Sequence, residues 1–103
     1  INYSPRYGVL KVDSIPAGFS FVNVNSEYAD LNMYVEREAS YILEVMLHDQ
    51  ALLHTPPEYG ELEVVEEEAE AVHLRGLMGT DPNTASRVKI TAPKKCIISI
   101  QNR

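Results

Sequence analysis

Short runs in which every second residue is apolar recur along the whole chain. Leu10 and Val12 flank a lysine in the first run, and Ile98 and Ile100 flank a serine in the last. Because successive side chains of a β-strand point to opposite faces of a sheet, this alternation is typical of strands with one buried face. The sequence therefore predicts an all-β chain. The runs occupy residues 10–12, 22–24, 31–35, 43–47, 62–64, 72–74, 88–90 and 98–100.

The runs are evenly spaced and are separated by turn residues. Leu10 and Val22 are 12 positions apart, and Ile90 and Ile100 are 10 positions apart. Proline and glycine stand between runs in SIPAG, TPPEYG, GTDPN and TAPKK, where they favour chain reversals. Short strands at regular spacing are compatible with a β-solenoid, a β-sandwich or a barrel, and spacing alone does not distinguish these architectures.

Two segments interrupt the alternation. VEREASYILEVML begins with helix-favouring residues but ends in strict alternation, so it predicts a turn followed by a strand. VVEEEAEAVHL carries glutamates at positions 66, 67, 68 and 70. It is short for an independent helix, and we predict a solvated acidic loop between two strands.

Composition excludes several classes of protein. The net charge of −6, from 15 acidic and 9 basic residues, repels phosphate backbones and anionic lipid surfaces, so nucleic acid is not an expected partner. No apolar run approaches the roughly 20 residues that span a bilayer, so we expect no membrane insertion. The chain opens with Ile1 rather than methionine, and residues 1–103 are interpreted as a single all-β domain from a longer protein.

The residues that most often carry chemistry have no local motif. His48, His54 and His73 lack the close spacing to other histidines and cysteines that structural zinc sites use, so each is interpreted as a surface or turn residue. Cys96 alternates with the isoleucines that follow it and is predicted to be a small core residue rather than a nucleophile. No serine lies in the glycine-framed turn of a hydrolase. The sequence therefore predicts no metal, no cofactor and no enzyme.

Three short motifs carry aromatic and small residues: YGVLKV at residues 7–12, SEYAD at 26–30 and ASY at 39–41. They are similar to the Tyr-Gly-x-Leu-x-Val, Ser-x-Tyr-x-Asp and Ala-Ser-Tyr units of the adhesin-like domains of exported and cell-surface proteins of Bacteroidetes. SRVKITAP and CIISI resemble the closing units of those domains. Residues 48–72 depart from the pattern, so the resemblance implies no strand order there.

The resemblance implies a short-stranded β-solenoid or β-roll, with a β-sandwich as the alternative architecture. It also implies an exported protein, located in the periplasm, at the outer membrane or outside the cell. In such a solenoid each coil buries the apolar face of its neighbour. Tyr7, Tyr28 and Tyr41 belong to the motifs, and we place them in structural stacks at the corners of the coils.

The expected function is non-catalytic contact with another macromolecule, a protein or a glycan at the cell surface. One alternative is a structural spacer domain that self-associates as a homodimer through open strand edges. Another is a glycan-binding module. Tyr34 lies out of phase with Met33 and Val35 and is therefore the candidate exposed aromatic for ligand binding.

Overall fold

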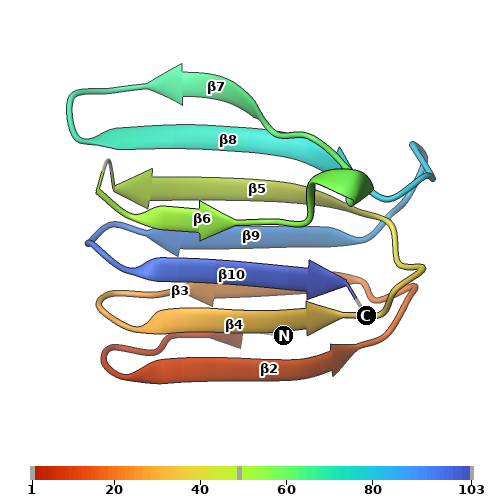
Figure 1. Cartoon of the computed structure of the whole chain (residues 1–103), viewed down its shortest axis with the longest axis horizontal. Coiled ribbons are helices and arrows are strands. Elements are labelled where there is room, and N and C mark those ends of the chain that lie inside the picture. The colour runs from red at the N-terminus through yellow and green to blue at the C-terminus, as the bar shows by residue number, and fades with distance from the viewer. Residues whose placement is uncertain (1, 49, 103) are drawn as a thin grey trace.

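A computed structural model describes residues 2–48 and 50–102, and β-strands account for most of them (Figure 1). Within these residues the structure has no helix with the length and hydropathy of a membrane span. The predicted all-β class is confirmed. The elements are β1 (Asn2–Tyr3), β2 (Val9–Ile15), β3 (Phe21–Asn25), β4 (Asp30–Val35), β5 (Tyr41–His48), β6 (Leu52–His54), the 3-10 turn η1 (Pro57–Tyr59), β7 (Glu63–Glu67), β8 (Ala71–Met78), β9 (Arg87–Ala92) and β10 (Ile97–Asn102).

The strands form two sheets. The six-stranded sheet has the order β1-β3-β9-β5-β8-β7, and the four-stranded sheet has the order β2-β4-β10-β6. From β1 to β6 the chain alternates between the sheets, and the pairs among β1, β3, β9 and β5 and among β2, β4, β10 and β6 are all parallel. The last two strands lie inside the sheets rather than at an end, because β9 pairs with β3 and β5 and β10 pairs with β4 and β6.

The acidic segment forms a hairpin, so the predicted acidic loop is wrong for most of its length. Glu66 and Glu67 belong to β7, which pairs antiparallel with β8. At the turn, the Glu68 N–H donates to the Ala71 carbonyl over 2.8 Å. Pairing with β8 provides hydrogen-bond partners for backbone N–H and C=O groups of β7, while its side chains stay exposed. A high density of glutamates therefore does not prevent a strand here.

The hairpin extends the six-stranded sheet beyond the four-stranded sheet. β8 and β7 continue past β5, whereas the four-stranded sheet stops at β6, and Figure 1 shows the hairpin at this end of the stack. The lead-in to β7 is held against β8, because the Gly79 N–H donates to the Tyr59 carbonyl over 2.6 Å. One end of the molecule therefore has a sheet edge with no facing strand among the described residues.

The core lies between the two sheets and is built by the predicted alternation. Every second residue of β3, β4, β5, β9 and, as far as Ile100, of β10 is apolar and almost completely buried, and the residues between them face outwards. Burying this apolar surface is the main favourable term in folding. The largest fully buried side chains are Tyr41, Leu31, Met33, Leu43, Met78, Ile90, Ile98, Ile100, Val22, Val24, Val35 and Val45.

The three tyrosines of the motifs are not equivalent. Tyr7 and Tyr28 stack with ring centroids 5.4 Å apart and an angle of 2° between their planes, as predicted. Tyr41 was expected in the same kind of stack, but it is fully buried and packs instead against Phe19 with ring centroids 6.0 Å apart. Burial raises the pKa of Tyr41, because the phenolate would lose its hydration.

Candidate binding surface

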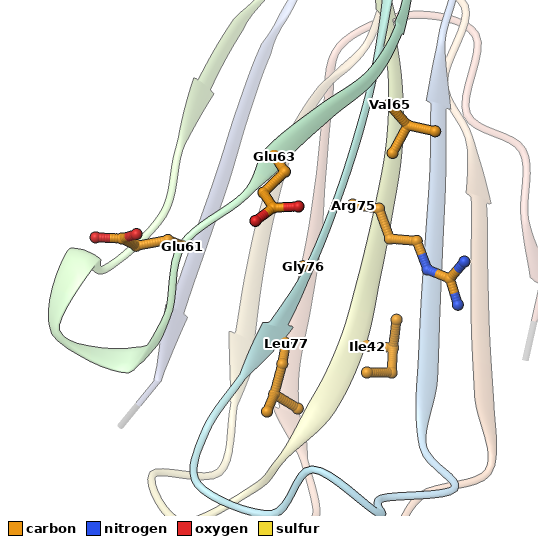
Figure 2. A pocket seen from close by; sticks show the side chains of 7 residues that line it. All are labelled: Ile42, Glu61, Glu63, Val65, Arg75, Gly76 and Leu77. Carbon is orange, nitrogen blue, oxygen red and sulfur yellow. The ribbon is translucent and has the colours of Figure 1, made fainter.

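A hollow of about 330 Å³ lies on the outer face of the six-stranded sheet, where β5, β8 and the lead-in to β7 meet (Figure 2). We refer to it as the hairpin hollow. It is open to solvent and combines apolar, acidic and basic side chains from segments far apart in the sequence. Its lining residues are Ile42, Glu61, Glu63, Val65, Arg75, Gly76 and Leu77.

Two glycines allow the lead-in to β7 to approach β8 closely at the hairpin hollow. A Cβ atom on Gly76 would lie 2.1 Å from the carbonyl oxygen of Glu61, and a Cβ on Gly60 would lie 2.1 Å from that of Leu77. Gly60 forms an antiparallel bridge with Met78, in the same register as Glu63 opposite Arg75. Side chains at the two glycine positions would collide with backbone, so the lead-in to β7 can lie this close beside β8 only because both residues are glycine. Gly76 also lines the hairpin hollow.

The hairpin hollow has an apolar base and a charged rim. Ile42 of β5 and Leu77 of β8 are cross-strand partners and are half-buried. Arg75 extends away from Glu61 and Glu63 (Figure 2), and among the described residues its guanidinium makes no ion pair or hydrogen bond. A planar guanidinium with free donors is suited to a carboxylate or carbonyl of another molecule.

Charges of alternating sign run across the sheet beside the hollow. The strand register places Lys89, Glu44, Arg75 and Glu63 opposite one another in that order on β9, β5, β8 and β7. Glu44 also interacts with His73, whose Nε2 lies 2.7 Å from the Glu44 Oε1. Opposite charges on neighbouring strands attract, but among the described residues no two members of this row form an ion pair with each other.

Tyr34, the predicted ligand-binding residue, lies on the other sheet. It is half-buried on the outer face of β4, opposite Gln101 of β10. The Nζ atom of Lys11 lies 5.8 Å from the centre of the Tyr34 ring, within the range of a cation–π contact. The structure does not bring Tyr34 together with the hairpin hollow, and its role in binding stays a prediction.

The stacked pair of Tyr7 and Tyr28 forms a second surface feature. The rings are 70% and 47% exposed, although we predicted for them only a structural role. The guanidinium carbon of Arg6 lies 5.9 Å from the centre of the Tyr7 ring, and its Nε lies 3.1 Å from the Glu27 Oε2. Their repeated position in the sequence motifs indicated the stacking but not the exposure.

The histidines and the cysteine are dispersed. His54 is exposed on β6, His48 is half-buried at the end of β5, and His73 faces Glu44. No group of three metal-binding side chains occurs in residues 2–48 and 50–102. Cys96 is buried as predicted, and burial together with the nearby charge of Asp30 raises the pKa of its thiol. The nucleophilic thiolate is therefore disfavoured.

Sequence reasoning missed the hairpin hollow because its lining comes from β5, β7 and β8 and depends on their pairing. The available signal was Gly76, which interrupts a run of alternating apolar and polar residues. Glycine inside a strand often marks a place where another backbone segment approaches closely. No family model, curated protein or solved structure matches the chain.

Proposed function

We propose that this chain is a non-catalytic domain that presents the outer face of its six-stranded sheet to another macromolecule, as the adhesin-like domains it resembles are expected to do. The observation that carries the proposal is the hairpin hollow. An apolar base surrounded by polar side chains, with an arginine whose donors are free, is typical of the centre of a protein–protein contact. Location in an exported or cell-surface protein is part of the proposal and rests on the motifs.

We propose a β-solenoid or β-roll as the finer architecture, and the arrangement is equally compatible with a β-sandwich. What supports the solenoid is the alternation of the chain between two sheets with parallel pairing. The hairpin and the insertion of β9 and β10 between earlier strands depart from a simple succession of coils. Either architecture leaves the hairpin hollow on an outer face.

Retention of coated beads under flow tests the proposed function. Beads that carry the domain would be passed over surfaces coated with immobilised oligosaccharides or with extracellular proteins. The hollow variant, Val65→Ser with Arg75→Ser, removes two exposed side chains of the site. The matched control, Val9→Ser with Arg37→Ser, removes the same exposed residue types elsewhere.

At least one coat should retain the wild-type and control beads and release beads with the hollow variant. Because the four substituted positions are exposed, all three proteins should melt at similar temperatures. If no coat retains wild-type beads better than the hollow variant, the proposed function is wrong.

A glycan-binding surface at Tyr34 is a second candidate. The observation that favours it is the set of polar neighbours of Tyr34. By strand register, Asn32 and Gln101 lie on the same outer face of the four-stranded sheet as Tyr34. An aromatic ring beside amide side chains is a suitable arrangement for a sugar. Tyr34→Ser would then release beads from oligosaccharide coats, while protein coats would be unaffected. Equal retention on oligosaccharides would eliminate this candidate.

Self-association as a spacer domain is the third candidate. The free edges include β1 with two residues, β6 with three, and β2, whose register shifts between Val12 and Ile15. Short and irregular edge strands are features by which proteins limit pairing between copies. Light scattering over a range of concentrations decides the matter, since a spacer that self-associates must show a mass that increases with concentration.

A further inference from the structure

We propose that the outer edge of β7 receives an extended basic segment of a partner protein as an additional strand of the six-stranded sheet. This inference rests on the proposed function and specifies the partner that the hairpin end of the sheet would bind. The proposed binding site includes the open edge of β7 and the exposed valines of that strand, Val64 and Val65, in addition to the hairpin hollow. Addition of a strand to a sheet edge is a common mode of peptide recognition.

The backbone of β7 has one paired edge and one open edge. Its inner edge pairs with β8 from Glu63 opposite Arg75 to Glu67 opposite Val72. β7 is the last strand in the sheet order, and no other strand of the described residues pairs with it (Figure 1). The N–H and C=O groups that point outwards from β7 can therefore bond to an incoming strand.

An added strand would also complete an apolar row of the core. The register places Ile90, Val45, Leu74 and Val64 side by side on β9, β5, β8 and β7. Ile90 and Val45 are fully buried, Leu74 is half-buried, and Val64 is 58% exposed. The row loses its cover because the four-stranded sheet stops at β6. An apolar side chain on an incoming strand would lie next to Val64 and bury it.

The opposite side of β7 offers a second apolar contact. Val65 is 57% exposed and lines the hairpin hollow. The register of β7 shifts between Val64 and Glu66, which is the geometry of a bulge and places an extra residue in the strand. Val64 extends the apolar core row, and Val65 lines the hairpin hollow. Because both valines are exposed, we expect the incoming segment to carry apolar residues that bury them.

Charge defines the remaining chemistry of the occupant. Residues 58–75 contain seven of the 15 acidic residues of the chain and one of its nine lysines and arginines, Arg75, so the other eight acids are balanced by the other eight bases. The entire net charge of −6 is thus located on the hairpin and its lead-in. Lysines or arginines in the partner would complement this charge.

The same charge argues against a second copy of the chain at this edge. Pairing β7 with β7 would bring two sets of glutamates together, and like charges on adjacent strands are destabilising. Acidic side chains and a bulge are features with which edge strands avoid pairing with copies of themselves. The glutamates of β7 attract a basic segment and repel a second copy of the chain, so this edge favours a basic partner over self-pairing.

The experiment titrates the domain with the acetylated peptide Lys-Val-Lys-Val-Lys-Val-Lys and measures both affinity and backbone amide hydrogen exchange. The repeat Glu-Val-Glu-Val-Glu-Val-Glu is the control peptide. Glu66→Gln with Glu67→Gln removes two charges from β7, and Glu27→Gln with Glu38→Gln removes two from other parts of the surface. All four positions retain a polar side chain of the same shape.

We expect the basic peptide to bind and the acidic peptide not to bind. The β7 variant should lower the affinity roughly tenfold, and the control variant should change it less than about twofold. Added peptide should slow amide exchange in residues 63–67, because new backbone hydrogen bonds form there. A basic peptide that binds without slowing exchange in β7, or that does not bind at millimolar concentration, overturns strand addition.

The outcome can be separated from that of the proposed function. If the peptide fails while beads still distinguish the wild-type domain from the hollow variant, only the inference about the β7 edge is wrong. If both experiments fail, the proposed function is wrong as well.

Discussion

Replacing Ile90 with aspartate should prevent the chain from folding at neutral pH. Ile90 is fully buried on β9, with Val24 of β3 and Val45 of β5 as its parallel partners. Removing a buried isoleucine side chain costs roughly 2–5 kcal/mol, and burying a carboxyl group without a hydrogen bond costs about 2–7 kcal/mol more. Their sum is comparable to the whole stability of a typical domain, about 5–15 kcal/mol.

Two companion variants separate these contributions. Ile90→Ala removes the side chain without adding a polar group, so it should lower the free energy of unfolding by roughly 2–5 kcal/mol and leave the fold intact. Asn23→Asp places the same carboxylate on the outer face, opposite Lys89, and should change stability by less than about 0.5 kcal/mol.

The effect of pH on Ile90→Asp has a definite sign. Burial raises the pKa of a carboxyl group above its ordinary value of about 3.9, because the charged form loses its hydration. The folded state then binds the proton more tightly than the unfolded state does. The additional loss of stability relative to Ile90→Ala should therefore be smallest below about pH 4 and grow as the pH rises through the folded-state pKa.

Urea and thermal unfolding monitored by circular dichroism measure these differences. Ile90→Asp should lack a cooperative transition at pH 7, while Ile90→Ala and Asn23→Asp retain one. A cooperative transition of Ile90→Asp within about 5 °C of the wild-type midpoint would refute the assignment of Ile90 to the core.

Three further substitutions test other parts of the structure. Ser14 has a φ of 58° in β2, a region that favours glycine, so Ser14→Gly should raise the free energy of unfolding by up to about 1 kcal/mol in urea titrations; a loss of stability would contradict that backbone conformation. Gly76→Ala should destabilise by several kcal/mol, because its Cβ would lie 2.1 Å from the Glu61 carbonyl oxygen; a neutral effect would mean that the lead-in to β7 does not lie that close to β8. Because burial raises the pKa of Tyr41, the folded state keeps this proton longer and stability should fall above about pH 10, by at most about 1.4 kcal/mol per pH unit. Tyr41→Phe should remove this dependence of stability on pH in unfolding experiments between pH 9 and 12, which bracket the ordinary tyrosine pKa of about 10. An unchanged slope would mean that other groups cause the dependence.

The strands could be predicted from the sequence wherever the alternation was long enough to read. Val88 and Ile90, or Ile98 and Ile100, point to one side of their strands because the side-chain period of a strand is two. β1 and β6 were missed because two or three residues are too few to show a period. The runs at 62–64 and 72–74 fall in or next to β7 and β8 as predicted. The length of β7 was underestimated because glutamates occupy it, and their charge resembled that of a loop.

The order of the strands could not be predicted, because it depends on contacts between distant segments. Residues 87–92 insert between β3 and β5, and residues 97–102 insert between β4 and β6. Apolar alternation states which face of a strand is buried but not which strand lies beside it. The hairpin hollow depends on the same long-range pairing, so the sequence could indicate Gly76 as unusual without indicating what approaches it.

Amide hydrogen exchange of the free domain reports directly whether β9 and β10 lie inside the two sheets while β7 is an open edge. We expect the slowest exchange in β9 and β10, although they come last in the chain, and fast exchange at the outward amides of β7. Protection in β7 equal to that in β9 would show that β7 is not an open edge, because the edge proposed to receive a partner strand would then already be covered.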